Sequence, residues 1–220
     1  MSKIYYIMGK SATGKDTIYK NLLKLWPKFK TIVPYTTRPS RQGERDGVEY
    51  FFTSPERLEE WKSSGKIIEL RTYDTVMGPW SYFTVDDGQF ETEQDEAFLM
   101  IGTPEAYKKM CRYFGQKRIV PLYIEVPDGE RLMRAVERES TQNPPNYREV
   151  CRRYLADEDD FSEENLAGLG INKRFLNRDI ESCLSEILSD IRALEAQALE
   201  TKEEASAQAV RSEPKEQASK

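Results

Sequence analysis

The residues from Gly9 to Thr17 have the types and spacing of a phosphate-binding loop. In order they are Gly9, Lys10, Ser11, Ala12, Thr13, Gly14, Lys15, Asp16 and Thr17. Glycines let the backbone curl so that successive N–H groups point at phosphate oxygens, and a lysine after the second glycine reaches the β- and γ-phosphates of a nucleoside triphosphate. We therefore expect this segment to bind a triphosphate, with Lys15 taking part in phosphoryl transfer.

Asp16 stands where such loops usually carry Ser or Thr, whose hydroxyl ligates Mg²⁺. A carboxylate oxygen is also a ligand for this hard cation. Beside phosphates, an acidic side chain is repelled unless a cation lies between the two. We expect Asp16 and the neighbouring hydroxyl of Thr17 to hold Mg²⁺.

A second polar segment runs from Tyr35 to Phe52, and here the chain resembles the guanylate kinase family. That family has a T-T-R-x-x-R-x-G-E-x-x-G-x-x-Y-x-F segment at about this distance after its phosphate loop. The matching residues are Thr36, Thr37, Arg38, Arg41, Gly43, Glu44, Gly47, Tyr50 and Phe52.

The resemblance implies that Arg38, Arg41 and Tyr50 hold the phosphate of GMP, with Thr36 in the same acceptor site and Arg38 also acting in catalysis. The chemistry is suitable, because guanidinium groups form bidentate, charge-assisted bonds with phosphate oxygens and a phenol adds a neutral donor. The alternative reading of Arg38 and Arg41 is a pair of solvated loop arginines.

The same family reads guanine with a glutamate and with a Y-G-[ST] element. Glu69 matches the glutamate in order and spacing, and a carboxylate accepts from the ring N–H and the exocyclic amine of guanine. Tyr82 and Thr84 match the second element, although Phe83 replaces its glycine. The resemblance thus implies that Glu69, Tyr82 and Thr84 bind the substrate; an exposed strand glutamate is the other reading of Glu69.

The chain departs from the family after this region. The family's next sheet strand ends in acidic residues that help to place Mg²⁺ and the acceptor, whereas here the stretch from Leu99 to Thr103 contains no acid. One acid is missing and one is gained at Asp16, so Asp16 is a candidate to compensate.

Arginines gather in two later segments that predict a helical lid. The first segment holds three at helical spacing that ends with Arg138, and the second, after two prolines, holds Arg148, Arg152 and Arg153. Cations suit phosphoryl transfer, because negative charge spreads over the equatorial oxygens in the transition state. We expect Arg138 and Arg152 to be catalytic and at least half of these arginines to lie on a solvated helix face. The segment around Asn177 resembles the family's N-D-D element, which implies a contact with the adenine of ATP.

The elements that must position these residues follow from apolar patterning. An apolar strand at Lys3–Met8 precedes the loop and an amphipathic helix at Lys15–Leu25 follows it, which favours a real phosphate site over a chance match. Further strands at Ala97–Ile101 and Ile119–Val126, with helices between them, predict an α/β fold of the P-loop kinase type. This fold has a central parallel sheet flanked by helices.

We expect one guanylate-kinase-like domain over residues 1–195. It has a small β-rich acceptor-binding insertion at about 34–90 and a helical lid at about 128–160. Within the insertion the sequence predicts a loop at 34–47, strands at Ile67–Thr72 and Tyr82–Val85, and a Gly78-Pro79 turn. From 196 to 220, Glu, Lys, Ala, Gln and Ser dominate, which predicts a disordered charged tail.

Composition narrows the chemistry and the setting. The 220 residues include no histidine, which excludes Ser-His-Asp hydrolysis and His-ligated metals. The net charge of −5 argues against a nucleic-acid partner, and no apolar run is long enough to predict a membrane span. The three cysteines form no C-x-x-C pair, so we expect thiols in the cytoplasm. Nothing in the sequence predicts an oligomeric state.

The sequence thus predicts ATP-dependent phosphorylation of GMP to GDP with Mg²⁺. One alternative is a related P-loop kinase with another acceptor, such as ribose 1,5-bisphosphate, because the Gly-Lys-Asp loop is similar to that of ribose 1,5-bisphosphate phosphokinases. Another is a guanylate-kinase-like binding module without catalysis, although such modules typically lose the phosphate loop.

Overall fold

The computed structural model describes residues 2–41, 43–75, 77–90 and 96–212. A five-stranded sheet in the order β2-β7-β1-β8-β9 forms its centre, and all neighbouring strands are parallel. The strands are β1 (Lys3–Met8), β2 (Lys30–Thr31), β7 (Ala97–Ile101), β8 (Ile119–Glu125) and β9 (Arg174–Leu176). The predicted parallel α/β architecture is confirmed.

Helices cover both faces of this sheet because its central strands are apolar on both faces. Tyr5 and Ile7 of β1 pack in a core with α1 (Lys15–Leu25) and α7 (Ile180–Ser212). Ile4 and Tyr6 face a second core, which includes α3 (Pro104–Phe114) and α6 (Glu163–Gly168). A short 3₁₀ turn, η1 (Gln116–Arg118), joins α3 to β8.

A second, four-stranded sheet in the order β4-β3-β6-β5 forms the β-rich insertion. Its strands are β3 (Tyr35–Thr36), β4 (Phe51–Phe52), β5 (Ile67–Thr75) and β6 (Gly78–Val85), and α2 (Pro55–Ser63) follows β4. The helix α2 begins with a common pair of start signals, since the hydroxyl of Ser54 caps it and Pro55 occupies its first turn.

Two details of the insertion differ from the sequence prediction. Tyr35 and Thr36, expected in a loop, form a strand because they pair with Phe83 and Tyr82 of β6. The Gly78-Pro79 pair, expected as a turn, begins β6, because Thr75 and Gly78 already oppose each other in the antiparallel ladder of β5 and β6. Local turn propensity is outweighed here by cross-strand pairing.

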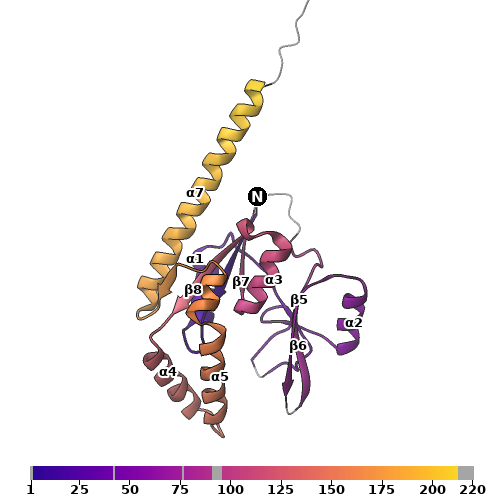
Figure 1. Cartoon of the computed structure of the whole chain (residues 1–220), viewed down its shortest axis with the longest axis vertical. Coiled ribbons are helices and arrows are strands. Elements are labelled where there is room, and N and C mark those ends of the chain that lie inside the picture. Colours follow the sequence, from indigo (N-terminus) through magenta and orange to yellow (C-terminus); the bar gives the residue numbers. More distant parts are fainter. Residues whose placement is uncertain (1, 42, 76, 91–95, 213–220) are drawn as a thin grey trace, which may run out of the picture.

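The two helices expected for the lid are present as α4 (Asp128–Ser140) and α5 (Tyr147–Asp160). They lie next to each other at the end of the molecule opposite the free end of α7 (Figure 1). The first helix follows β8 directly, so the lid is attached at the carboxyl edge of the central sheet.

The helix α7 continues to Ser212 and projects away from the rest of the molecule (Figure 1). The structure continues α7 through residues 196–212, where the sequence predicts a disordered tail; Ala, Glu, Lys and Gln in this stretch are strong helix formers. Residues 213–220 lie outside the described part of the chain. Within that part, no helix has an apolar stretch long enough to cross a lipid bilayer.

Candidate active site

The phosphate loop connects β1 to α1 at the carboxyl edge of the central sheet. Gly14 adopts a left-handed conformation with φ of +80°, and a Cβ there would lie 2.6 Å from the side-chain nitrogen of Asn177. A Cβ at Gly9 would lie 2.5 Å from the carbonyl oxygen of Ile124 on β8. Both positions therefore require glycine, one for conformation and contact and the other for close packing against the sheet.

Thr13 and Asn177 hold the loop in shape. The Thr13 hydroxyl donates to the carbonyl oxygen of Lys10 at 2.9 Å, and Asn177 Nδ2 donates to the carbonyl oxygen of Thr13 at 2.8 Å. Asn177 is 4% exposed, and Arg134 of the lid donates to its carbonyl oxygen at 3.2 Å. The Asn177 side chain therefore supports the loop in this structure; its contact with adenine stays a prediction.

Lys15, Asp16 and Thr17 form the first turn of α1, with the last two exposed. The pKa of the Tyr50 phenol in the second sheet is raised chiefly by burial, and the negative charge of Asp16 is among the further causes. Asp16 thus lies on the side of the phosphate loop that faces the second sheet. An exposed carboxylate and hydroxyl in this position fit Mg²⁺, which keeps several waters and takes its other ligands from phosphates.

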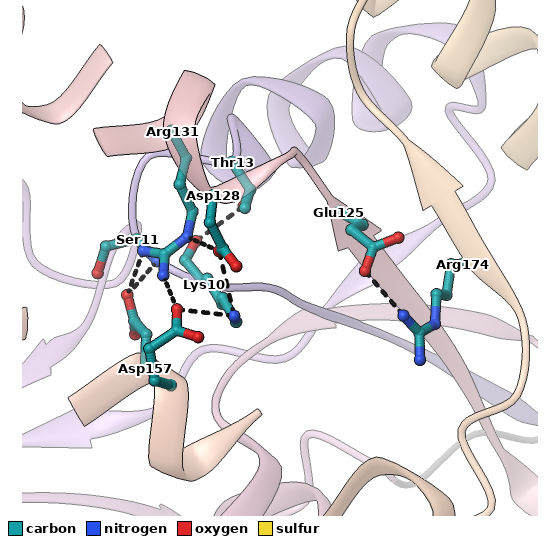
Figure 2. Close-up of polar contacts among 9 residues, drawn as sticks. Lys10, Ser11, Thr13, Glu125, Asp128, Arg131, Asp157 and Arg174 are labelled. Carbon is teal, nitrogen blue, oxygen red and sulfur yellow. Dashed lines mark hydrogen bonds and ion pairs between the residues drawn. The ribbon is translucent and has the colours of Figure 1, made fainter. Parts of the chain in front are cut away.

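Acidic residues of the lid contact the phosphate loop in this structure (Figure 2). The backbone N–H of Ser11 donates to Oδ2 of Asp157 at 2.7 Å. Lys10 Nζ forms ion pairs with Asp128 at 3.2 Å and Glu158 at 2.8 Å. A carboxylate oxygen on a loop N–H takes the role that a phosphate oxygen takes in a bound nucleotide.

Arg131 joins these acids in a network of ion pairs (Figure 2). Its side chain is 1% exposed, donates to Asp128 at 2.7 Å, pairs with Glu158, and lies 4.0 Å from the ring centre of Tyr154. The sequence groups Arg131 with the lid arginines. The structure assigns it a structural position, because it neutralises the acids that approach the loop.

The two arginines expected to be catalytic, Arg138 and Arg152, are exposed on the lid. Arg152 forms two hydrogen bonds of 2.8 Å with Glu149 one turn earlier on α5. Hydrogen bonds from Arg152 lower the pKa of Glu149 to about 2. Neither arginine is bonded to the phosphate loop within the described residues, so their catalytic role stays a prediction.

Arg38 follows strand β3 of the second sheet, and it is 3% exposed. It forms a bidentate ion pair with Glu44, with distances of 2.9 and 2.8 Å, and its guanidinium lies 5.4 Å from the ring centre of Tyr50. Its Nε is buried and has no hydrogen-bond partner among the described residues. A buried donor without a partner favours a bound anion at this position.

The other residues expected to bind the acceptor differ in their burial and in their contacts around Arg38. The rings of Tyr50 and Tyr82 are 5.7 Å apart. Burial acts to lower the pKa of Arg38 and Glu44 acts to raise it, and Tyr82 is among the smaller causes that raise it, so Tyr82 lies near the guanidinium. Arg41 is exposed, and its backbone N–H donates to Glu44 at 2.8 Å. Thr36 is fully buried and donates to the carbonyl oxygen of Ser81 at 2.9 Å, so its hydroxyl supports the sheet.

Glu69 and Thr84 meet as the sequence predicts. Thr84 Oγ1 donates to Oε1 of Glu69 at 3.0 Å, and the Glu69 side chain has no exposed surface. The pairing of β5 and β6 shifts register between Ile67 and Glu69, which directs the carboxylate toward Thr84. The reading of Glu69 as an exposed strand residue is therefore wrong.

The sequence reasoning missed Arg71, which pairs with Glu69 and donates to Thr103 at 2.9 Å. Its signal was the two-residue spacing from Glu69, which places both side chains on one face of a strand. At the acid-free end of β7, a Cβ at Gly102 would lie 2.0 Å from the hydroxyl of Tyr6, so a side chain at this position would require Tyr6 to move.

Comparison with known proteins agrees with this geometry. The family model described as guanylate kinase matches residues 1–163. A guanylate kinase of Symbiobacterium thermophilum is 30% identical over 193 residues, covering 86% of this chain and 84% of that protein. One of Salinibacter ruber is 26% identical over 190 residues, covering 86% of this chain and 95% of that protein.

A solved structure supports the fold. The crystal structure of guanylate kinase from Anaplasma phagocytophilum aligns with a TM-score of 0.60 and 21% identity, covering 87% of this chain and 85% of that one. With the family match spanning the phosphate loop, the second sheet and the lid, the chain belongs to the guanylate kinase family.

Proposed function

We propose that this chain transfers the γ-phosphoryl group of ATP to GMP, giving ADP and GDP. The observation that carries the proposal is the buried pair of Glu69 and Thr84 in the second sheet, whose strand β3 is followed closely by the buried Arg38. A carboxylate that accepts from two adjacent N–H groups suits guanine, which offers a ring N–H and an exocyclic amine. Membership of the guanylate kinase family supports the same acceptor.

The phosphate loop is proposed to hold the triphosphate of ATP. Its backbone N–H groups and the N-terminus of α1 bind the phosphates, and Lys15 reaches the transferring group. Asp16 and Thr17 would hold Mg²⁺, which supplies neutralisation of phosphate charge when bound. When ATP binds, the hydrogen bond from the Ser11 N–H to the Asp157 carboxylate must be replaced by one to a phosphate oxygen.

The acceptor phosphate is proposed to lie against Arg38, with Tyr50 and Tyr82 beside it. Its oxygen is already ionised at neutral pH, so transfer needs no general base. The lack of histidine in the chain is therefore compatible with this reaction. Catalysis then depends on alignment and charge neutralisation. Arg138 and Arg152 are proposed to reach the transferring phosphoryl group after the lid moves.

The setting is also a proposal. We place the reaction in the cytoplasm, because Cys111, Cys151 and Cys183 are all free thiols. We propose a small nucleotide as the partner, without nucleic acid or membrane; the net charge of −5 favours this over a nucleic-acid partner.

The test is an ADP-release assay with ATP, Mg²⁺ and a panel of GMP, dGMP, AMP, UMP, CMP and ribose 1,5-bisphosphate. We expect turnover with GMP, and a loss on the order of 100-fold in Lys15→Met because phosphate charge is no longer neutralised. Turnover of ribose 1,5-bisphosphate and of none of the nucleotides would show that the acceptor is ribose 1,5-bisphosphate and not GMP. Failure to bind ATP with Mg²⁺ in calorimetry would favour a binding module without catalysis.

A further inference from the structure

Arg71 covers the recognition carboxylate of the acceptor site. Its Nε donates to Oε2 of Glu69 at 3.1 Å and its Nη2 to Oε1 at 3.4 Å. The Arg71 side chain is 11% exposed while that of Glu69 is 0% exposed. Within this ion pair, the surface that reaches solvent therefore belongs to Arg71 and not to Glu69.

The charge of Arg71 acts on the acceptor site as well as on Glu69. Burial opposes the charged form of Arg71, but the Glu69 carboxylate outweighs this and raises its pKa. After burial, which raises it most, the positive charge of Arg71 is among the causes that affect the pKa of the Tyr50 phenol, acting to lower it. Arg71 thus lies close to both the base-reading carboxylate and the phosphate-binding tyrosine.

Both groups keep unused hydrogen-bonding capacity. A guanidinium has five N–H groups. Within the described part of the chain the Arg71 bonds use one each on Nε, Nη1 and Nη2, which leaves one on each terminal nitrogen. Each carboxylate oxygen accepts about two bonds. Oε1 of Glu69 already accepts from Thr84 and from Arg71 Nη2, whereas Oε2 accepts from Arg71 Nε, which leaves capacity on Oε2. The 3.4 Å contact between Nη2 and Oε1 is the longest of the set, so an entering N–H donor displaces it most readily.

We propose that Arg71 determines base specificity by donating a hydrogen bond from Nη2 to the purine carbonyl oxygen beside the N–H groups that Glu69 accepts. This inference rests on the proposed function and deepens it. Guanine carries its 6-oxygen next to the ring N–H. Adenine carries an amine there, which would set a donor against the guanidinium, so Arg71 also rejects AMP.

Three acceptor nucleotides distinguish the role of Arg71 in base recognition from that of Glu69. GMP carries all the groups, 6-thio-GMP replaces only the 6-oxygen with a poorly accepting sulfur, and IMP lacks only the exocyclic amine. We expect the wild type to prefer GMP over 6-thio-GMP by about 10–100-fold in kcat/KM, as for a bond to a charged donor. In Arg71→Met this ratio falls close to one, whereas the preference for GMP over IMP, which belongs to Glu69, remains.

A purely structural Arg71 gives a different result: Arg71→Met would lose GMP and 6-thio-GMP turnover equally, which overturns the proposal. If Arg71→Met does not fold, Arg71→Lys serves, because it keeps a cation beside Glu69 but loses the planar fork. We expect a reduced ratio in that variant, and the full wild-type ratio would overturn the proposal. Arg112→Met, on the exposed face of α3, is the matched control and should match the wild type.

Calorimetry without ATP separates this inference from the proposed function. Tighter binding of GMP than of 6-thio-GMP without turnover would sink the proposed function and support the role of Arg71. Equal binding of the two, with turnover intact, would overturn the role of Arg71 alone. Binding of neither would overturn both.

Discussion

At the scale of single residues, each buried arginine of the acceptor site forms an ion pair with a glutamate of the protein. Arg38 is held by Glu44 and Arg71 by Glu69, so neither charge is buried alone. The Arg38 pair leaves Nε without a partner within the described residues. The partner acid therefore fixes the guanidinium in place and leaves a donor for the substrate.

Arg38→Lys tests this arrangement. Lysine keeps the charge but cannot pair with Glu44 through two nitrogens while offering a third to phosphate. We expect KM for GMP to rise about 10–100-fold, with KM for ATP little changed, measured by steady-state kinetics. Arg57→Lys on α2, where the arginine is exposed, serves as control. An unchanged KM for GMP in Arg38→Lys would place the acceptor phosphate elsewhere.

At the scale of elements, α5 holds both the acid that occupies the phosphate loop and an arginine expected to act on the phosphoryl group. Asp157 accepts from Ser11, and Arg152 is paired with Glu149. Because one helix holds both, displacement of Asp157 by a phosphate and movement of Arg152 are linked through the same rigid element. Binding of ATP is thus expected to reposition the lid.

Asp157→Ala removes the carboxylate that competes with phosphate. We expect KM for ATP to fall about 3–10-fold, because one negative charge no longer opposes the triphosphate and no side chain must leave the Ser11 N–H. Asp159→Ala, at an exposed position on the same helix, should leave KM unchanged. A higher KM for ATP in Asp157→Ala would show that the acid assists binding instead.

Glu149 gives α5 a pH dependence. Its folded pKa of about 2 lies below the usual glutamate value of about 4.3, so its contribution is present above about pH 4.3 and is lost as pH falls toward 2. The side chain is 34% exposed, so the contribution is below about 1 kcal/mol. We expect the stability difference between the wild type and Glu149→Gln, from urea unfolding, to shrink over that range. A constant difference would contradict the ion pair.

At the scale of the whole molecule, α7 joins the body only through its first half. Ile187 and Ile191 are fully buried against the central sheet, and Glu195 accepts from the hydroxyl of Tyr5 at 2.5 Å. Beyond this point the helix extends away from the sheets and the lid (Figure 1). The extension is thus expected to contribute little to folding or to the site.

Truncation tests the division of α7. A chain that ends after Ala198 should keep the wild-type kcat and a Tm within about 2 °C, because it retains Ile187, Leu188 and Ile191, which are buried against the central sheet. A chain that ends after Glu186 lacks Ile187, Leu188 and Ile191 and should fail to fold stably. Thermal unfolding and the ADP-release assay measure both. Loss of activity in the longer truncation would assign a role to the extension.

The sequence by itself determined the phosphate loop and the parallel sheet, because both depend on local signals. Gly14 is required by its left-handed backbone conformation, and strands buried on both faces have continuous apolar runs. The helical spacing of arginines also placed the two lid helices. The assignment of Glu69 and Thr84 to one binding site came from resemblance to a family, and the pairing of β5 with β6 brings these two side chains into contact.

Only the tertiary structure decided which partner each charge has. Asp157 lies 146 positions from Ser11 in the chain, and Arg71 lies 32 positions from Thr103, so no local pattern joins them. Charged side chains find their partners through the packing of elements that are distant in the chain. The sequence therefore identified the groups able to bind phosphate and base. The fold determined which protein groups these side chains contact before the substrate binds.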